Sequence, residues 1–173
     1  MNFKSDYTMK LTKMIALVIV LFIGNIAMAQ EKASPPAETK TSVNGADITI
    51  KYSQPSVKGR EIWGALVPYD KVWRTGANEA TIFETSKDIK VQGESLKAGK
   101  YTLFTIPNGD EWKIIFNSKL GQWGAYAYSS DDDVLTVTAK PTTSDFVEIF
   151  DISADNGKIS LSWDKVKVDF VVE

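Results

Sequence analysis

The sequence contains neither cysteine nor histidine, and this double absence excludes several common kinds of site. Without cysteine there is no disulfide, no thiol nucleophile and no thiolate ligand for zinc. Without histidine there is no Ser-His-Asp triad and no imidazole ligand for a metal. We therefore expect no metal site and no cofactor. The question of enzymatic activity stays open, but the side chains that remain favour a protein without it.

A large surplus of one charge is also missing. The chain has 20 Lys and Arg residues against 22 Asp and Glu residues, and the lysines are spread among the acids. Binding to nucleic acid needs a concentrated basic face, because the phosphate backbone supplies most of the affinity. We therefore expect no nucleic-acid partner.

The long apolar run of the chain lies near its N-terminus. Two lysines precede an apolar stretch over residues 14–27, and Ala27-Met28-Ala29 offers small residues to a signal peptidase. The stretch is shorter than the about 20 residues that span a bilayer, and Gly24 and Asn25 interrupt it. We expect a signal peptide over residues 1–29 and an exported mature protein, periplasmic or secreted, with no stable membrane insertion. An uncleaved anchor is the alternative.

The segment after the signal is poor in large apolar side chains. Residues 30–40 contain Pro35-Pro36 among Ser, Ala, Glu and Lys, so this part cannot form a core of its own. We interpret it as an N-terminal leader, either a flexible tail or a short strand. A single domain is expected over residues 41–173.

Alternating apolar and polar residues predict strands through this domain. In the first of them Ile48, Ile50 and Tyr52 fall on one face, which is typical of a half-buried strand. No window has a helical period, and no crossover helix for a parallel sheet is present. The sequence predicts an all-β fold, an antiparallel β-sandwich or jelly-roll-like barrel of about eight or nine strands. The other expected strands are residues 80–85, 89–91, 101–106, 112–117, 134–139, 147–152, 159–163 and 166–172.

One long segment, residues 54–78, breaks the alternation and contains both arginines of the chain, Arg60 and Arg74. A connection of this length in a compact domain is commonly functional or contains a short helix. Arginine suits planar, two-pronged contacts to anions and stacking on indoles such as Trp63 and Trp73. One hypothesis is therefore a clamp on an anionic ligand. The alternative is that both arginines fix the loop by binding its acids or carbonyls.

Aromatic residues between strands suggest a second binding feature. Trp123, Tyr126 and Tyr128 lie in a glycine-bearing stretch, where they could form a shelf for a sugar ring or a peptide. Packing over a sheet edge is the alternative. Trp112 and Trp163 fall in phase with core positions of their strands, so we expect them in the core.

Acidic residues support two weaker hypotheses. Glu79, beside Asn78, is the first candidate acid for a hydrolase such as a glycosidase, which would need a second carboxylate at a fixed separation. Asp131-Asp132-Asp133 lacks the alternate spacing of a calcium loop, so we interpret it as a solvated turn.

Seven runs of sequence are familiar as a set: residues 53–60, 62–64, 66–69, 71–81, 98–107, 115–117 and 122–124. These runs resemble the domain-of-unknown-function 2911 family, and the similarity spans nearly the whole mature chain. The resemblance implies an exported bacterial protein and brings no established activity. Members often have Ser-Pro-His near the mature start, where this chain has Ser34-Pro35-Pro36, so a role for that histidine does not transfer.

Taken together, these features favour a non-catalytic protein that binds a small or saccharide-like ligand or is associated with the cell envelope. A hydrolase dependent on carboxylates is the alternative, and an interaction domain with an exposed apolar patch is the third. We assign no catalytic residue. The candidate ligand-binding residues are Arg60, Trp63, Trp73, Arg74, Asn78, Glu79, Trp123 and Tyr126.

Overall fold

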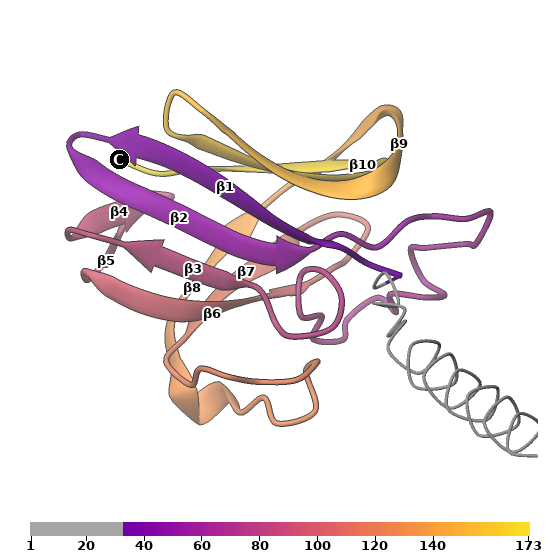
Figure 1. Ribbon diagram of the computed structural model, residues 1–173, viewed down its shortest axis with the longest axis horizontal. Helices are drawn as coiled ribbons and strands as arrows, with labels where there is room; N and C mark the ends of the chain where they lie inside the picture. The colour runs from indigo at the N-terminus through magenta and orange to yellow at the C-terminus, as the bar shows by residue number, and fades with distance from the viewer. Residues whose placement is uncertain (1–32) are drawn as a thin grey trace, which may run out of the picture. The chain divides into compact units, whose positions relative to one another are not determined.

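A computed structural model describes residues 33–173, and this part of the chain is built almost entirely of antiparallel strands (Figure 1). It contains one short 3-10 helix, η1, and no α-helix. The elements are β1 (Pro36–Val43), β2 (Ala46–Ser53), β3 (Ile82–Thr85), β4 (Ile89–Val91), β5 (Glu94–Leu96), β6 (Gly99–Ile106), β7 (Trp112–Asn117), η1 (Ser130–Asp132), β8 (Asp133–Ala139), β9 (Pro141–Asp155) and β10 (Lys158–Val171).

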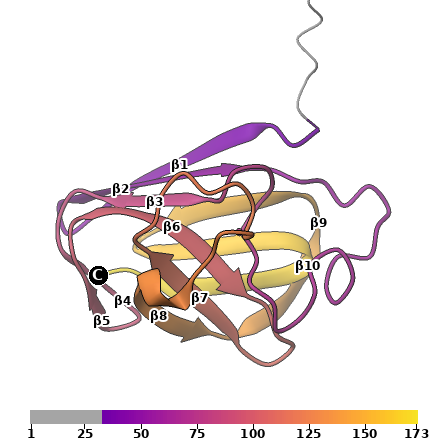
Figure 2. The ribbon, with the colours of Figure 1, turned by 90° about the horizontal axis from the view of Figure 1, so that it is seen from below.

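The strands form a sandwich-like arrangement, which confirms the predicted all-β class. Six of them make one antiparallel sheet in the order β1-β2-β3-β6-β7-β8. The long hairpin β9-β10 lies over one face of this sheet, and β4-β5 is a separate short hairpin (Figure 1). Seen from below in Figure 2, the loop of residues 118–132 lies in front of β6 and β7, with β9 and β10 behind them.

The main core fills the space between the sheet and the β9-β10 hairpin. Because side chains alternate along a strand, every second residue of β2 points into this core, as Ile48 and Ile50 do. Phe83 and Phe116 meet edge to face at 5.0 Å in the sheet, and Phe170 of β10 packs on Phe116 from the other layer. A smaller cluster around Phe104 lies on the opposite face of the sheet.

Strand β10 is longer than the sequence analysis predicted, because it joins the two expected strands 159–163 and 166–172. The buried apolar positions are odd-numbered from Ile159 to Trp163 and even-numbered from Val168 onward. Between them the register with β9 shifts on both sides of Asp164, which has a φ of 54°. An extra residue of this kind is a β-bulge, which reverses the facing of side chains without ending the strand.

The part of the N-terminal leader that the structure describes takes the strand form, one of the two forms that the sequence left open. Residues 36–40 are the first part of β1 and pair with β2 from Pro36↔Ser53 to Lys40↔Thr49. Before Val43 the strand has no large apolar side chain, so the sequence there has no alternation of apolar and polar residues. The expected signal peptide, residues 1–29, lies outside the described residues. Within residues 33–173 no helix is long and apolar enough to cross a membrane.

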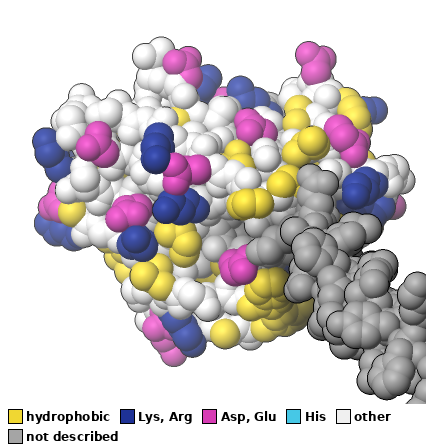
Figure 3. All heavy atoms as spheres, in the orientation of Figure 1, with side chains coloured by type: hydrophobic (Ala, Val, Ile, Leu, Met, Phe, Trp, Pro, Cys, Tyr) yellow, Lys and Arg dark blue, Asp and Glu magenta, His cyan; other side chains and the backbone are white. Residues whose placement is uncertain are grey.

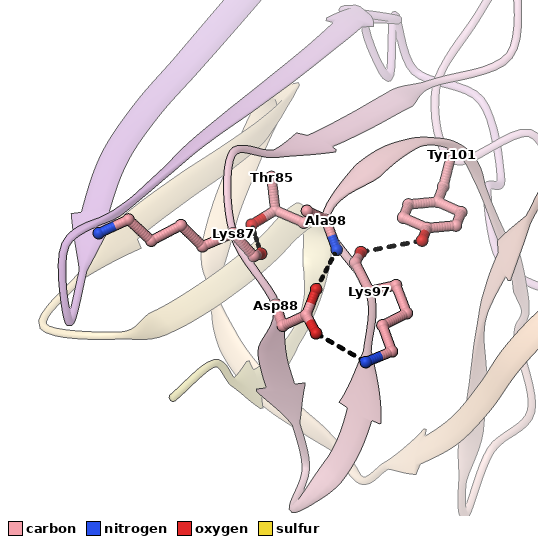
Figure 4. Close-up of polar contacts among 6 residues, drawn as sticks. All are labelled: Thr85, Lys87, Asp88, Lys97, Ala98 and Tyr101. Atoms are coloured by element: carbon pink, nitrogen blue, oxygen red, sulfur yellow. Dashed lines mark hydrogen bonds and ion pairs between the residues drawn. The ribbon is translucent and has the colours of Figure 1, made fainter.

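A small polar network closes the β4-β5 hairpin (Figure 4). The Asp88 carboxylate accepts a hydrogen bond from Lys97 Nζ at 2.7 Å and another from the Ala98 backbone N–H at 2.8 Å. The Tyr101 hydroxyl donates to the Lys97 carbonyl at 2.9 Å. These bonds fix the entry to β6, which carries part of the site described below.

Charged side chains of both signs are interspersed on the face shown in Figure 3, without a broad basic area. Six ion pairs in the described part of the chain join lysines to nearby acids, and all involve partly or largely exposed side chains. Such pairs add little to stability. The surface drawn there therefore has no electrostatic footprint of the kind that phosphate backbones require.

Candidate functional site

The irregular segment between β2 and β3 is anchored at its far end along β6. The Trp73 N–H donates to the Thr105 carbonyl at 2.7 Å, and the Thr105 N–H donates back to the Trp73 carbonyl at 2.9 Å. The Thr81 N–H then bonds to the Arg74 carbonyl at 3.1 Å. Residues 72–74 therefore run beside β6 as a short extended piece, in continuation of the sheet.

Because this piece is extended, its side chains alternate between the two faces of the sheet. Trp73 belongs to the main core, where it stacks on Trp163 with ring centres 5.9 Å apart and an interplanar angle of 14°. Val72 packs instead against the smaller cluster on the opposite face. Arg74 shares the side of Val72 and reaches the loop around Gly124, where an added Cβ would lie 3.7 Å from Arg74 Nη1.

The backbone directly after Arg74 is held in an unfavourable conformation. Thr75 is buried and has a φ of 55°, a region that β-branched residues strongly avoid. The Thr75 hydroxyl bonds to Thr105 Oγ1 at 3.1 Å, and Thr81 Oγ1 donates to the Thr75 carbonyl at 2.6 Å. Strain of about 1–3 kcal/mol at one residue persists only where surroundings enforce it, and such residues cluster at ligand-binding sites.

Two adjacent cavities open beside this strained turn. The first, here the arginine cavity, has a volume of about 240 Å³. Its polar lining comes from Arg60, Arg74, Asn78 and Ser34, and its apolar lining includes Trp73 and Trp163. No Asp or Glu of the described residues lines it, so both charged groups at its wall are positive.

The second cavity, here the tyrosine cavity, has a volume of about 310 Å³ and is bounded by the loop of residues 118–132. Leu66, Val72, Ala125 and Tyr126 give it mostly apolar walls, and Lys71 lies at its edge. It shares Leu66, Val67, Trp73 and Arg74 with the arginine cavity. The two cavities therefore meet at Arg74.

The structure assigns different surroundings to the two arginines. Arg60 Nε donates to the Val57 carbonyl at 3.1 Å, and its Nη2 donates to the Ser56 carbonyl, so Arg60 fixes its own turn as the structural alternative expects. The guanidinium of Arg74 bonds to no residue within 33–173, and its Nε is buried. Neither arginine forms an ion pair with an acid of this range. Arg74 is therefore the one with unused hydrogen-bonding capacity.

The tryptophans of the irregular segment belong to the core. Trp63 packs edge to face on Trp112 with centres 5.0 Å apart and also contacts Trp73 and Trp163. Trp73 Nε1 donates to the Gly76 carbonyl at 3.1 Å, so this indole closes the strained turn. Trp63 lines neither of the two cavities, whereas Trp73 lines both.

The aromatic residues of the 118–132 loop divide into three roles. Tyr128 packs on Phe104 at 5.1 Å and covers the sheet. Tyr126 is 89% exposed and lines the tyrosine cavity. Trp123 is 60% exposed, pairs through its backbone with Glu79, and lies outside both cavities.

Acidic groups stand apart from the cavities. Glu79 is exposed and lines neither of them. Asp133 accepts hydrogen bonds from Asn117 Nδ2 at 2.8 Å and from the Tyr128 hydroxyl at 2.7 Å. Burial, followed by the Asp133 carboxylate, raises the pKa of Tyr128 well above its usual range. Within residues 33–173 no three acidic side chains gather as a metal site would require.

Of the eight expected binding residues, Arg60, Trp73, Arg74 and Asn78 line the arginine cavity, and Tyr126 joins Trp73 and Arg74 in the other cavity. Sequence reasoning missed Ser34, Lys71, Ala125 and Trp163. Lys71 adjoins the expected residues, so proximity in the chain could have suggested it. Trp163 belongs to β10, and no sequence signal places it beside a turn about ninety positions earlier.

Comparisons with known proteins add one finding. A family model described as a protein of unknown function (DUF2911) matches residues 34–172. No curated protein and no solved structure gives a significant match.

Proposed function

Because the chain belongs to the family of proteins of unknown function DUF2911, whose description names no activity, we propose its function from the cavities: the domain binds a small anionic ligand without transforming it. The observation that carries this proposal is the convergence of Arg60 and Arg74 on one cavity that no carboxylate lines. A wall with two positive charges and no nearby carboxylate favours an anion, because charges of one sign at a concave surface raise the local concentration of the opposite ion.

Two unpaired hydrogen-bond donors support the proposal. Arg74 Nε and Trp163 Nε1 are buried without a partner, and both residues line the arginine cavity. Buried donors of this kind are rare in native structures, since each costs about 1–3 kcal/mol when left unpaired. A carboxylate or phosphate in the cavity would supply acceptor oxygens at the wall that these two residues line.

The strained turn supports the same reading. Trp73, on the inner face, and Thr75, buried at positive φ, hold the chain on both sides of Arg74. The backbone at Arg74 is thereby fixed, and its side chain leaves the chain from a set position beside the arginine cavity. Preorganisation of this kind reduces the entropy lost when a ligand binds.

The expected export also stays a proposal. Lysines followed by the apolar run of residues 14–27 and by Ala27-Met28-Ala29 support cleavage after Ala29 and release as a free protein. The intact mass of the purified protein tests this, because cleavage removes residues 1–29. The full-length mass in the membrane fraction would contradict it.

The hydrolase alternative receives less support from the geometry. A glycosidase needs two carboxylates that flank the substrate. Neither the arginine cavity nor the tyrosine cavity is lined by Asp or Glu, and Glu79 lies on an exposed bridge to Trp123. The arrangement therefore favours binding over carboxylate catalysis.

The proposal is tested by adding acetate or inorganic phosphate, at constant ionic strength, to the protein purified after expression of the full chain. We expect a concentration-dependent rise in Tm, since a ligand at ten times its Kd adds about 1.4 kcal/mol. Arg74→Met should remove this rise. It should leave the Tm of the free protein unchanged or higher, because a buried donor without a partner disappears.

Lys113→Met is the matched control, because Lys113 is exposed on β7 and lines neither cavity. It should leave the response to anions intact. A large loss of Tm in Arg74→Met, together with an unchanged response to both anions, would show that Arg74 is structural and overturn the proposal.

A further inference from the structure

We infer that the ligand is an amphiphilic monoanion, with its charged group in the arginine cavity and an apolar chain or ring in the tyrosine cavity. The inference rests on the proposed anion binding and adds the chemical class of the ligand. Its basis is the meeting of the two cavities at Arg74, with different walls on the two sides.

The difference in lining is pronounced. The side chains of Arg60, Arg74 and Trp163 line the arginine cavity, and the side chain of Asn78 donates to the Ser34 carbonyl at 3.1 Å beside it. Away from Arg74, the lining of the tyrosine cavity is mostly apolar and includes Leu66, Val72, Ala125 and Tyr126. A molecule that satisfies both must carry its polar and apolar parts at opposite ends.

Exposed apolar side chains at the tyrosine cavity indicate the kind of group that would cover them. Leu66 is 45% exposed and Tyr126 is 89% exposed, although both border a hollow. A hydrocarbon or aryl group in this hollow would remove their surface from water, which is favourable in proportion to the area buried.

The loop that carries Tyr126 is fixed to the arginine-bearing segment. The Gly124 N–H donates to the Asn78 carbonyl at 3.1 Å, and the Ala80 N–H donates to the Gln122 carbonyl at 2.9 Å. A Cβ on Gly124 would lie 2.9 Å from the Tyr126 ring, so glycine lets the ring lie against the loop backbone. The apolar wall is thus held beside Arg74 by backbone contacts.

Lys71 is the one feature of the tyrosine cavity that could favour a second anionic group. Lys71 is exposed, so its ammonium group remains hydrated, and its long stem can cover apolar surface. An apolar ligand group therefore fits this wall without leaving a buried charge. A dianion is the outcome against which the inference is tested.

The experiment measures Kd for acetate, butanoate, hexanoate and octanoate with the purified protein by NMR titration. Each added methylene should lower Kd about two- to fourfold until the hollow is filled, as expected for burial of hydrocarbon. Suberate, the dicarboxylate of the same length as octanoate, should bind more weakly than octanoate, because its second charge enters the apolar hollow.

Two variants test whether the gain in affinity with each added methylene comes from the tyrosine cavity. Ala125→Phe fills the hollow, and Tyr126→Ala removes an exposed wall with little effect on folding. Both should reduce the gain in affinity per methylene by more than they change the Kd of acetate. Ala127→Phe is the control, because Ala127 is exposed on the same loop and lines neither cavity, so the full gain should remain.

The outcomes separate the inference from the proposed function. A Kd that is independent of chain length but still depends on Arg74 overturns the inference and leaves anion binding intact. Tighter binding of suberate than of octanoate also overturns it, because a dianion with its second charge at Lys71 would then be the favoured ligand. Absence of binding by every carboxylate and by phosphate overturns the proposed function itself.

Discussion

Arg74 is held in place by its neighbours in the chain and not by partners of its own guanidinium. Trp73 on one side packs into the core, and Thr75 on the other is buried at positive φ. Arg60 shows the opposite arrangement, because its guanidinium bonds to carbonyls of its own turn. At the scale of single residues, the unused hydrogen-bonding capacity of a side chain identifies the site better than the residue type does.

Asp88 gives a prediction for the pH dependence of a single group. The hydrogen bond from Lys97, followed by the one from the Ala98 N–H, holds the pKa of the Asp88 carboxyl below its usual range. A pKa lowered by folding means that the stabilisation is complete above the ordinary aspartate pKa of about 3.9 and is lost as pH falls through the lower folded value. NMR titration of the Asp88 carboxyl carbon should therefore give a midpoint below 3.9.

Lys97→Met supplies the comparison for this measurement. This substitution removes the hydrogen bond from Lys97, the largest cause of the lowered pKa, and keeps the one from the Ala98 N–H. The titration midpoint of Asp88 should therefore rise only part of the way to the ordinary aspartate value. Because the Lys97 and Asp88 side chains are 81% and 59% exposed, added salt should produce a similar but smaller change. A titration midpoint at the ordinary aspartate value in the unmodified protein would contradict this interpretation of the polar network in Figure 4.

At the scale of elements, tight turns determine which strands pair. The β4-β5 and β9-β10 hairpins each have two linking residues with positive φ, as type I′ turns require. Gly93 and Gly157 occupy the second positions, with φ of 85° and 78°. Their surroundings differ, because a Cβ on Gly93 would meet nothing within 4 Å, whereas one on Gly157 would lie 2.6 Å from the Val172 carbonyl oxygen.

This pair predicts a difference in stability that backbone conformation alone cannot produce. Gly93→Ala should cost about 1–2 kcal/mol, which is the usual penalty for an L-residue at positive φ. Gly157→Ala should cost about 1–3 kcal/mol more, because the backbone at Val172 must also move. Urea unfolding of both variants measures the difference. Equal decreases in the free energy of unfolding would mean that the backbone at Val172 moves aside without an energetic penalty.

The strands that the sequence predicts are those that alternate cleanly. The alternation of Ile48, Ile50 and Tyr52 predicts β2, whereas β1 has no large apolar residue before Val43 and is defined by its pairing with β2. The two strands expected near the C-terminus form one strand, β10. The bulge at Asp164 interrupts the alternation of apolar and polar residues, so the sequence pattern predicts two strands there. Bulges and edge strands depend on partners that local sequence does not specify.

The same limit applies to the site. An irregular segment rich in arginine and tryptophan was predicted correctly between β2 and β3, and no helix lies within it. The sequence could not tell that Trp63 belongs to an indole cluster or that Trp123 lies outside the cavities. Those positions follow from how the β9-β10 layer and the 118–132 loop pack on the sheet, which are contacts between distant parts of the chain.

At the scale of the whole molecule, a buried tyrosine joins the two layers of the sandwich. Tyr52 of β2 donates its hydroxyl hydrogen to Asp151 Oδ1 at 3.0 Å, and the Ile152 N–H of β9 donates to the same hydroxyl oxygen at 3.0 Å. The Thr39 hydroxyl of β1 donates to the Ile152 carbonyl nearby. The edge of the hairpin therefore finds its hydrogen-bond partners among side chains of the sheet.

Tyr52→Phe tests this connection. Removing the hydroxyl leaves the buried Ile152 N–H unpaired, so the free energy of unfolding at pH 7 should fall by about 1–3 kcal/mol. Tyr126→Phe is the matched control, because its hydroxyl is exposed and has no hydrogen bond within the described range, and it should change the value little. If both variants were equally stable, β9 would be held by apolar packing alone.

The same tyrosine sets the direction of the response to alkali. Burial is the main reason that the pKa of Tyr52 is raised above its usual range, and the nearby Asp151 carboxylate acts in the same direction. A pKa raised by folding means that the stabilisation is complete below the unfolded value of about 10 and is lost as pH rises through the folded value. Urea unfolding between pH 8 and 11 should therefore show stability falling above about pH 10. The fall should be smaller in Tyr52→Phe, where the titrating group is gone, and an equal fall in both proteins would assign the alkaline response to the other tyrosines whose pKa is raised, Tyr101 and Tyr128.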